Sequence, residues 1–397
     1  MPDFSAYDLV VVGSGFFGAT IAERCASQLG MRVCVLEQRA HIGGNAWSEI
    51  DTDTDIEVHR YGSHLFHTSS EAVWHYVNRF SEFSNYRHRV VARHDNRFFT
   101  MPVNLGTLST LFGRFLSPSE ARALIAAEAT AAGITAPSNL EEKAVSLMGR
   151  TVYEALIKGY TKKQWQTDPR ELPADIITRL PVQLTFNDFY FADRFEGLPL
   201  TGYGGLFRRM LSTPGIDTWL ETDYFRVRCA IPRNVPVVFT GPVDRYFDYR
   251  AGALGWRTLD FESEVVPVAD FQGASVVNYP DEDVAFTRIH EFRHLHPERD
   301  YQRERTVVFR EFSRFAGRHD EPYYPIGRPT DKARYEAYRE MADGEANVIF
   351  GGRLGTYRYL DMHQAIGAAL KTFENRIAPH IRERRPLKLR ERVAAAV

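Results

Sequence analysis

The sequence predicts an α/β protein in which a Rossmann-like domain is interrupted by a helical bundle and by an antiparallel β-sheet domain. Three observations predict this class: a strand–helix–strand pattern at the start, repeated helix-start signals in the middle, and alternating apolar and polar residues in two other regions. The 397 residues can bury a large core, and 44% of them are apolar. This balance excludes a disordered protein.

The strand–helix–strand pattern occupies residues 8–36. Residues 8–12 form a short β-branched run, as expected of a buried parallel strand. Residues 19–29 have helical apolar spacing, with Gly30 just past the end, and residues 32–36 form a second apolar strand. The glycine-rich sequence GSGFFG stands at the strand-to-helix turn, where a dinucleotide binds in such units.

Each glycine of this turn has its own physical task. Gly13 permits the tight turn, Gly15 lets a pyrophosphate touch the backbone, and Gly18 lets helix and strand pack closely. The helix start adds free N–H groups for the phosphates, and Glu37 is placed to accept hydrogen bonds from an adenosine ribose. A glycine-rich turn without function is disfavoured, because strand, helix, strand and acid all stand where a dinucleotide needs them.

Helix-start signals indicate at least three helices between residues 117 and 165. A capping residue followed three positions later by an acid occurs three times: Ser117 with Glu120, Asn139 with Glu142, and Thr151 with Glu154. These helices are expected to pack as a small bundle.

Two other regions have the alternation of strands. Residues 89–103 predict a hairpin around an Asp-Asn turn. Residues 258–314, including 284–289 and 306–312, fit an antiparallel sheet with one polar face. Near the end of the chain, a buried strand (348–350) and a closing helix (360–373) are expected, followed by a frayed, arginine-rich tail.

The predicted domains are discontinuous in sequence. They are the Rossmann-like dinucleotide-binding domain (1–80, 200–250 and 338–382), the helical bundle (104–170), the sheet domain that receives the substrate (81–103, 171–199 and 251–337), and the tail (383–397).

Composition excludes several classes of function. A net charge of −2 provides no cationic field for nucleic acid. No run of eighteen apolar residues exists, so no transmembrane helix is expected, and the apolar start lacks the basic flank of a signal peptide. The three cysteines are unclustered, which predicts neither disulfides nor a metal site. A cytoplasmic location fits best.

A second glycine pair, Gly43-Gly44, follows Glu37 closely and would let another stretch of backbone approach the cofactor. Nicotinamide and flavin dinucleotides both use the first unit, but the second pair suits a long, buried FAD. The beginning of the chain resembles the glutathione-reductase-like and amine-oxidase-like flavoproteins. That resemblance implies FAD without defining a reaction.

Six further stretches, in one order, resemble the bacterial UDP-galactopyranose mutases, the FAD enzymes that interconvert UDP-galactopyranose and UDP-galactofuranose. The resemblance runs from about residue 7 to residue 380. Its motifs are residues 61–68 (YGSHLFHT), 159–165 (GYTKKQW), 171–173 with 179–181, 286–289 (FTRI), 322–325 (PYYP) and 351–362 (GGRLGTYRYLDM).

This resemblance implies the substrate contacts. Arg179 and Arg288 match the two arginines that hold the diphosphate, for which guanidinium groups are suited. Tyr160 is expected to stack on uracil and Trp165 to pack near the sugar. The remaining expected contacts are Tyr190, Tyr324, Tyr359, Asn278, Thr161, Ile157, His67 and His88.

Two details of the substrate region stand out. Leu156-Ile157 occupies the place where many family members carry Phe against the uracil, so aliphatic packing replaces flat stacking there. Residues 166–177 contain two prolines and few apolar residues, a composition that suits a surface lid rather than core. The resemblance implies that this loop closes over substrate.

The resemblance also implies the flavin contacts. His64 is expected to position the flavin through its backbone, with His67 near the isoalloxazine edge. Asp361 and Met362 open a helix whose N–H groups would face the flavin, and Arg353 would contact the flavin or its phosphates. The full set expected to bind FAD is Gly13, Gly15, Phe17, Gly18, Glu37, Gln38, Gly44, Asn45, His64, Leu65, Arg353, Leu360, Asp361 and Met362.

The implied reaction is an isomerisation in which N5 of reduced FAD attacks the anomeric carbon, UDP departs, the sugar ring opens and recloses, and UDP returns. The two arginines stabilise the departing diphosphate, and no acid–base pair of the protein is needed. A homodimer that supplies galactofuranose for cell-surface glycans is also implied.

Two alternatives remain open. A flavin amine oxidase would share the fold but has no use for diphosphate arginines. A non-catalytic binding protein like the Rab escort proteins would not retain flavin.

Overall fold

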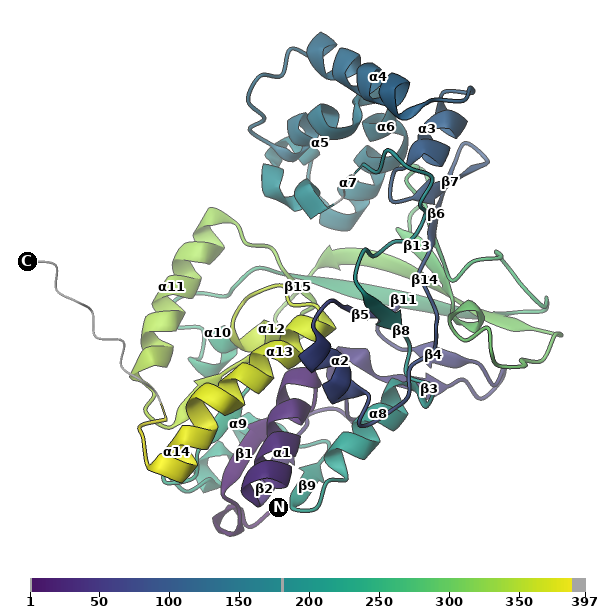
Figure 1. Ribbon diagram of the computed structural model, residues 1–397. Helices are drawn as coiled ribbons and strands as arrows, with labels where there is room; N and C mark the ends of the chain where they lie inside the picture. Colours follow the sequence, from purple (N-terminus) through teal and green to yellow (C-terminus); the bar gives the residue numbers. More distant parts are fainter. Residues whose placement is uncertain (1, 180–181, 388–397) are drawn as a thin grey trace, which may run out of the picture.

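The computed structural model describes residues 2–179 and 182–387, and its main layer is a five-stranded parallel sheet (Figure 1). The order is β16-β10-β1-β2-β9, so strands from both ends of the chain are neighbours. The strands are β1 (Leu9–Val12), β2 (Val33–Leu36), β9 (Ile216–Trp219), β10 (Val237–Phe239) and β16 (Val348–Phe350). The predicted α/β class with a Rossmann-like domain is confirmed.

Side chains of the parallel strands alternate between two cores, because successive residues of a strand point to opposite faces. Val11 and Val35 pack with helices α1 (Phe16–Leu29), α8 (Gly202–Leu211) and α13 (Met362–Thr372). Val10 and Cys34 pack on the other face with α9 (Tyr224–Val227). Both faces are therefore covered, which explains why β1 and β2 are apolar at every position.

Helix α1 begins at Phe16, three residues before the predicted start, because Gly15 is its N-cap. It ends as predicted, at Gly30 in the left-handed conformation (φ 64°). Helices α1 and α13 lie side by side in Figure 1, and α14 (Ala378–Glu383) follows. Leu387 is buried against the same core, so packed structure continues into the stretch expected to be a frayed tail. Residues 388–397 of that tail lie outside the described residues.

The second large sheet has seven strands in the order β15-β11-β14-β13-β12-β6-β7. Its strands are β6 (Val90–His94), β7 (Arg97–Met101), β11 (Trp256–Val266), β12 (Val276–Asn278), β13 (Arg288–Glu291), β14 (Thr306–Phe315) and β15 (Tyr324–Pro325). The hairpin β6–β7 turns at Asp95 and Asn96, both with positive φ, as expected of this pair in a tight turn.

One expectation about this sheet is wrong. The strand predicted over 284–289 begins only at Arg288, because residues 279–287 form a loop held by contacts to a neighbouring helix. The sheet is antiparallel as expected, except that β6 and β12 pair in parallel.

Short helices form a separate lobe at the top of Figure 1. They are α3 (Leu105–Leu111), α4 (Pro118–Ala131), α5 (Leu140–Met148), α6 (Arg150–Val152), the π-helical turn η3 (Tyr153–Lys158), α7 (Gly159–Trp165), η4 (Pro169–Glu171) and η5 (Ala174–Arg179). The predicted caps Ser117 and Asn139 are confirmed, each accepting a backbone N–H three residues later. Thr151 is not a cap, because its hydroxyl donates instead to Glu128 of the neighbouring helix.

The segment expected to form a loop lid is fastened to this lobe. Leu172 and Ile177 are buried in the bundle core, and the backbone N–H of Leu140 donates to the carbonyl of Leu172 at 2.9 Å. The expectation of a surface segment without core contacts is therefore wrong at these two residues. The bundle continues past its predicted end at residue 170.

The remaining elements connect these layers. They are β3 (Ser48–Ile50) with β4 (Glu57–His59), β5 (Phe66–Thr68) with β8 (Phe195–Gly197), α2 (Glu71–Val77), α10 (Val243–Tyr246), α11 (Pro329–Gly344), α12 (Gly352–Gly355), and the short turns η1 (Phe4–Ala6), η2 (Gly44–Ala46), η6 (Arg228–Ala230), η7 (Phe292–Leu295) and η8 (Phe373–Ile377). The domain boundary predicted at 337/338 falls inside α11, whose Tyr338 is fully buried.

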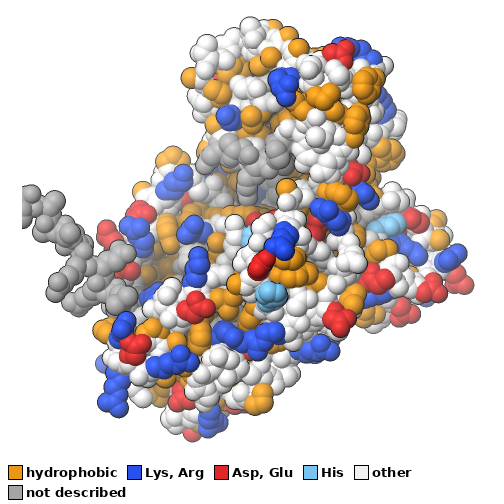
Figure 2. Space-filling view, viewed as in Figure 1, with side chains coloured by type: hydrophobic (Ala, Val, Ile, Leu, Met, Phe, Trp, Pro, Cys, Tyr) orange, Lys and Arg blue, Asp and Glu red, His pale blue; other side chains and the backbone are white. Residues whose placement is uncertain are grey.

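Figure 2 shows acidic and basic side chains interspersed over the visible face, as expected from the small net charge. In the part of the chain that the structure describes, no helix is both long enough and apolar enough to cross a membrane.

Replacing Ile177 by Ala should lower the free energy of unfolding by about 2–5 kcal/mol, because the methyl groups lost are buried in the bundle core. Urea denaturation of purified protein measures this loss. The half-buried neighbour Ile176→Ala is the matched control and should cost clearly less. Equal, small losses in both variants would contradict the packing of this segment.

Candidate functional site

The first cavity opens at the carboxyl ends of the parallel strands, where ligands bind in open α/β sheets. The last residues of β1, β2 and β10 line it, together with the glycine turn that follows β1. Of the residues expected to bind FAD, those lining this cavity are Gly13, Gly15, Phe17, Gly18, Glu37, Gln38, Gly44, Asn45, His64, Arg353, Leu360 and Met362.

The glycine turn has the geometry that its spacing predicts. Gly13 has φ +93°, which favours glycine. A Cβ at Gly18 would lie 2.0 Å from the carbonyl oxygen of Gly13, so helix and turn are in backbone contact. A Cβ at Gly15 would meet no atom within 4 Å, although Gly15 lines the cavity and caps α1. Gly15 thus leaves an open face of backbone at a helix N-terminus, which fits a pyrophosphate.

The second glycine pair touches the first turn. A Cβ at Gly44 would lie 3.3 Å from the Cα of Gly15, and the N–H of Gly43 donates to the Ser14 hydroxyl at 3.1 Å. That hydroxyl in turn donates to the buried carboxylate of Glu37 at 2.7 Å. Both backbone loops therefore border one cavity, as a dinucleotide bound along them requires.

Glu37 is already held from two sides. One carboxylate oxygen accepts from the N–H and hydroxyl of Ser14, and the other accepts from the N–H of Arg39 at 3.1 Å. A carboxylate offers about four acceptor positions, so one remains for a ribose hydroxyl.

The outer end of this cavity contains residues that the sequence did not indicate. Arg245 bonds Asp223 at 2.7 Å, lies 4.4 Å over the ring of Phe225, and donates to Gln38 at 3.3 Å. Asp223 and Phe225 follow β9 and Arg245 follows β10, far from the glycine turn in sequence. No local motif marks them, and only the cap signal of Asp223 before α9 was available.

The inner end of the first cavity adjoins a second cavity. Asn45, His64, Arg353 and Met362 line both. Arg353 is held in place, donating to the carbonyls of Tyr323 at 3.0 Å and Leu360 at 2.7 Å. A dinucleotide lying along the first cavity would therefore end at the second.

His64 sits at this junction in a defined conformation. Its backbone N–H donates to Nδ1 of His59 at 3.0 Å, and its own Nδ1 lies 2.7 Å from the carbonyl of Gly62. Burial lowers the pKa of His64 to about 4, so the ring is neutral at pH 7.

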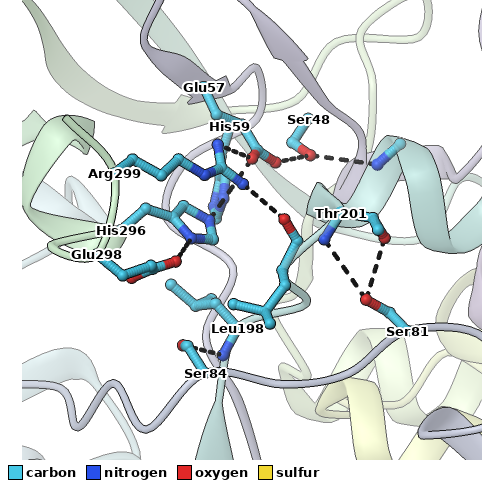
Figure 3. A network of polar contacts seen from close by, with 12 residues as sticks. Ser48, Glu57, His59, Ser81, Ser84, Leu198, Thr201, His296, Glu298 and Arg299 are labelled. Atoms are coloured by element: carbon cyan, nitrogen blue, oxygen red, sulfur yellow. Dashed lines mark hydrogen bonds and ion pairs between the residues drawn. The ribbon is translucent and has the colours of Figure 1, made fainter. Parts of the chain in front are cut away.

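A buried polar network fastens the strand that carries His59 (Figure 3). The Glu57 carboxylate pairs with Arg299 at 2.7 Å and accepts from the Ser48 hydroxyl at 2.5 Å. Arg299 also donates to the carbonyl of Leu200 at 3.0 Å. This network joins β3, β4 and the segment before α8. It therefore fixes the position of β4, whose His59 accepts the backbone hydrogen bond from His64.

The second cavity lies between the bundle, the seven-stranded sheet and the start of α13. The expected site residues that line it are Leu65, His67, His88, Ile157, Tyr160, Tyr190, Asn278, Arg288, Tyr324, Tyr359 and Asp361. These come from segments up to about 300 residues apart in sequence, and folding brings them together as the resemblance implies.

Arg288 is the cation of the cavity wall contributed by β13. Its Nε lies 3.3 Å from the buried carboxylate of Glu311, and it donates to the Tyr160 hydroxyl. Burial opposes ionisation of Glu311, but Arg288 and a hydrogen bond from His290 bring the pKa of Glu311 down to about 2. Glu311 therefore orients the guanidinium, whose side chain remains 30% exposed. Sequence reasoning identified Arg288 but missed Glu311.

His88 adds no charge to the cavity. Burial, together with the positive charge of Arg288, lowers the pKa of His88 to about 3. His67 is held differently, with its Nδ1 2.6 Å from the Asp193 carboxylate and its ring stacked 3.7 Å from Phe191.

Three expected substrate residues do not contribute described side chains to the cavity. Trp165 packs against the bundle core and Thr161 is buried in α7, so in the described structure neither lines this wall. The side chain of Arg179 lies outside the described residues, as do Leu180 and Pro181.

The fold and the first cavity define a Rossmann-like dinucleotide-binding protein: a parallel sheet carries a glycine turn, and a second glycine loop touches that turn. A family model described as an NAD(P)-binding Rossmann-like domain matches residues 11–80, and one described as UDP-galactopyranose mutase matches residues 155–359. A probable UDP-galactopyranose mutase from Klebsiella pneumoniae is 42% identical over 369 residues, covering 92% of this chain and 93% of the relative. The chain belongs to the UDP-galactopyranose mutase family, which confirms the resemblance.

Other similarities show how far this fold extends. A dTDP-fucopyranose mutase from Escherichia coli is 39% identical over 367 residues, covering 91% of this chain and 96% of the relative. The crystal structure of a reduced UDP-galactopyranose mutase has a TM-score of 0.67 at 13% identity, covering 96% of this chain and 94% of that one. A putrescine oxidase structure has a TM-score of 0.52 at 11% identity, covering 94% of this chain and 99% of that one. At such identities, the structural matches show the fold alone.

Gly15→Ala should reduce flavin retention at least about tenfold, ~1.4 kcal/mol in binding, because the added methyl enters the open face of backbone. The measurement is flavin absorbance per polypeptide after purification. The thermal midpoint of the flavin-free protein should stay near that of wild type, since the methyl meets no protein atom.

Gly18→Ala is the comparison. Its methyl collides with the backbone of Gly13, so this variant should lose thermal stability even without flavin. Full flavin content in Gly15→Ala would contradict the assignment of this turn as the site where the pyrophosphate of the flavin dinucleotide binds.

Proposed function

We propose that this protein catalyses the reversible ring contraction of UDP-galactopyranose to UDP-galactofuranose with reduced FAD as its cofactor. The observation that carries the proposal is the junction of the two cavities at His64 and Arg353. A dinucleotide bound along the glycine turn would present its inner end to the cavity that contains Arg288.

The residues fit FAD. Gly13, Gly15 and Gly18 would receive the pyrophosphate at the start of α1, and Glu37 the adenosine ribose. The start of α13, where Met362 lines both cavities, would offer backbone N–H groups to the flavin ring. When bound and reduced, the flavin supplies an electron-rich N5 that acts as a nucleophile at the anomeric carbon.

The protein's part is to bind and stabilise the leaving diphosphate. Arg288 would hold it with N–H groups that Glu311 and Tyr160 orient. Since His88 is neutral, the attraction for a diphosphate at this wall comes from Arg288. We assign Arg179 as the second diphosphate ligand from its motif in the family.

Tyrosines would enclose the sugar. Tyr324 and Tyr359 stack with ring centroids 5.8 Å apart, and Arg353 lies 5.0 Å over the ring of Tyr359. Burial raises the pKa of Tyr324, so its hydroxyl remains a hydrogen-bond donor at pH 7. Asn278 and Tyr190 complete the polar wall.

A second candidate substrate is dTDP-fucopyranose, the substrate named for the 39% identical relative. The aliphatic part of the cavity lining favours it, because such side chains would pack against a thymine methyl group. The residues of this part are Val90, Ala92, Met101, Leu156, Ile157 and Val276.

The wider setting rests on the family alone. We propose that UDP is the transient leaving group, that the protein works as a cytoplasmic homodimer, and that its product feeds the synthesis of cell-surface glycans. A flavin amine oxidase is disfavoured because it has no use for a diphosphate-binding arginine such as Arg288, which lines the second cavity.

Dithionite-reduced protein should convert UDP-galactofuranose to the pyranose form, while oxidised protein should be nearly inactive, because only reduced flavin has a nucleophilic N5. Chromatography of the nucleotide sugars measures both rates, and dTDP-fucofuranose is assayed in parallel. Equal rates in the two redox states would overturn the nucleophilic role of flavin. Faster turnover of the dTDP sugar would select the second candidate.

Arg288→Ala should lower kcat/KM at least about a hundredfold, ~2.7 kcal/mol, because the diphosphate loses a charged ligand. The flavin spectrum should remain normal, since Arg288 does not line the first cavity. Arg310→Ala is the matched control, because it lies on the adjacent strand and pairs with Glu264. Retained activity in Arg288→Ala would remove this residue from its assigned role.

A further inference from the structure

The amino group of Lys163 lies where four backbone carbonyls converge. It donates toward the oxygens of Tyr279 at 2.5 Å, Asp281 at 2.8 Å, Val284 at 2.9 Å and Phe286 at 3.1 Å. All four belong to the loop between β12 and β13. An ammonium group has three hydrogens, so at least one is shared between two carbonyls. One side chain of α7 thus binds four carbonyls spread over the whole loop.

This loop carries a polar substrate-cavity residue at each end. Asn278 is the last residue of β12 and Arg288 the first of β13, and the two are paired across the strands. The carbonyls of Tyr279 and Phe286, one and two residues away, are both bound by Lys163. A change in the loop would therefore move both side chains.

Helix α7 contacts the same region at two further points. A Cβ at Gly159 would lie 2.2 Å from the carbonyl oxygen of Pro280, so the helix backbone is pressed against the loop. One residue later, Tyr160 bonds Arg288 and its ring centroid lies 5.6 Å from the guanidinium carbon. Helix, loop and arginine form one connected unit.

Backbone carbonyls surround the charged amino group of Lys163. Within the described residues no carboxylate pairs with its amino group, so carbonyl dipoles compensate the charge. Burial lowers the pKa of Lys163 to about 8, although Asp281, Glu282 and Asp283 of the same loop oppose this. The neighbouring Lys162 differs, since its side chain is 38% exposed and forms a 2.8 Å ion pair with Glu282.

We propose that Lys163 is a positioning residue that holds the 279–286 loop so that Arg288 faces the substrate cavity. It acts through Arg288 and does not touch the substrate, since it does not line the cavity. The inference rests on the proposed function, in which Arg288 binds the diphosphate of a nucleotide sugar.

The test is the dissociation constant for UDP, measured by calorimetry on flavin-loaded protein. Lys163→Met should weaken UDP binding at least about tenfold, with an unchanged flavin spectrum. The double variant Lys163→Met/Arg288→Ala should bind UDP no more weakly than Arg288→Ala alone, because coupled residues are not additive. Lys162→Met is the matched control and should stay within about twofold of wild type.

Three results would overturn the inference: unchanged UDP affinity in Lys163→Met, losses that add in the double variant, or an equal loss in Lys162→Met. If Lys163→Met does not fold, Lys163→Gln replaces it, because its amide keeps two donors. The same criteria apply to it. Weak binding in Arg288→Ala with normal binding in the Lys163 variant would overturn this inference alone. A wild-type protein that does not bind UDP would overturn the proposed function as well.

Discussion

The backbone contact between Gly13 and Gly18 is the constraint on which the rest of the site depends. It brings the start of α1 against the end of β1, so the free N–H groups of the helix open into the cavity. The second glycine pair and Glu37 are then fastened to the same turn through Ser14. Any side chain at Gly18 would separate these parts.

The second cavity, to which we assign the substrate, depends on a different interaction, which is compensation of buried charge. Glu311 is buried, and an unpaired carboxylate there would be costly. Arg288 compensates this charge with an ion pair and His290 with a hydrogen bond, and the Glu311 carboxylate orients both side chains in return. Lys163 repeats the principle with carbonyl dipoles in place of a carboxylate. Both arrangements limit how the polar groups of the cavity wall can move.

Local signals predicted local structure well. The caps Ser117 and Asn139, the turn at Asp95 and Asn96, and the end of α1 at Gly30 all depend on contacts within a few residues. Thr151 shows the limit of such signals. It was predicted to cap a helix, but its hydroxyl donates to the carboxylate of Glu128 on another helix.

The prediction of a strand over 284–289 is wrong for a related reason. Its first four residues belong to a loop that Lys163 binds, and Lys163 lies over 100 residues earlier. Leu172 and Ile177 were likewise misjudged, since two apolar residues in a polar segment give no periodic signal of burial.

The sequence alone determined the dinucleotide turn, the class of fold and the family, because these reside in contiguous motifs whose spacing is itself the physical requirement. The partners of Arg288, the outer-end residues around Arg245 and the junction of the two cavities were decided only by tertiary structure. They are contacts between distant segments, and a side chain's neighbours across such distances depend on how whole layers pack, which no local pattern records.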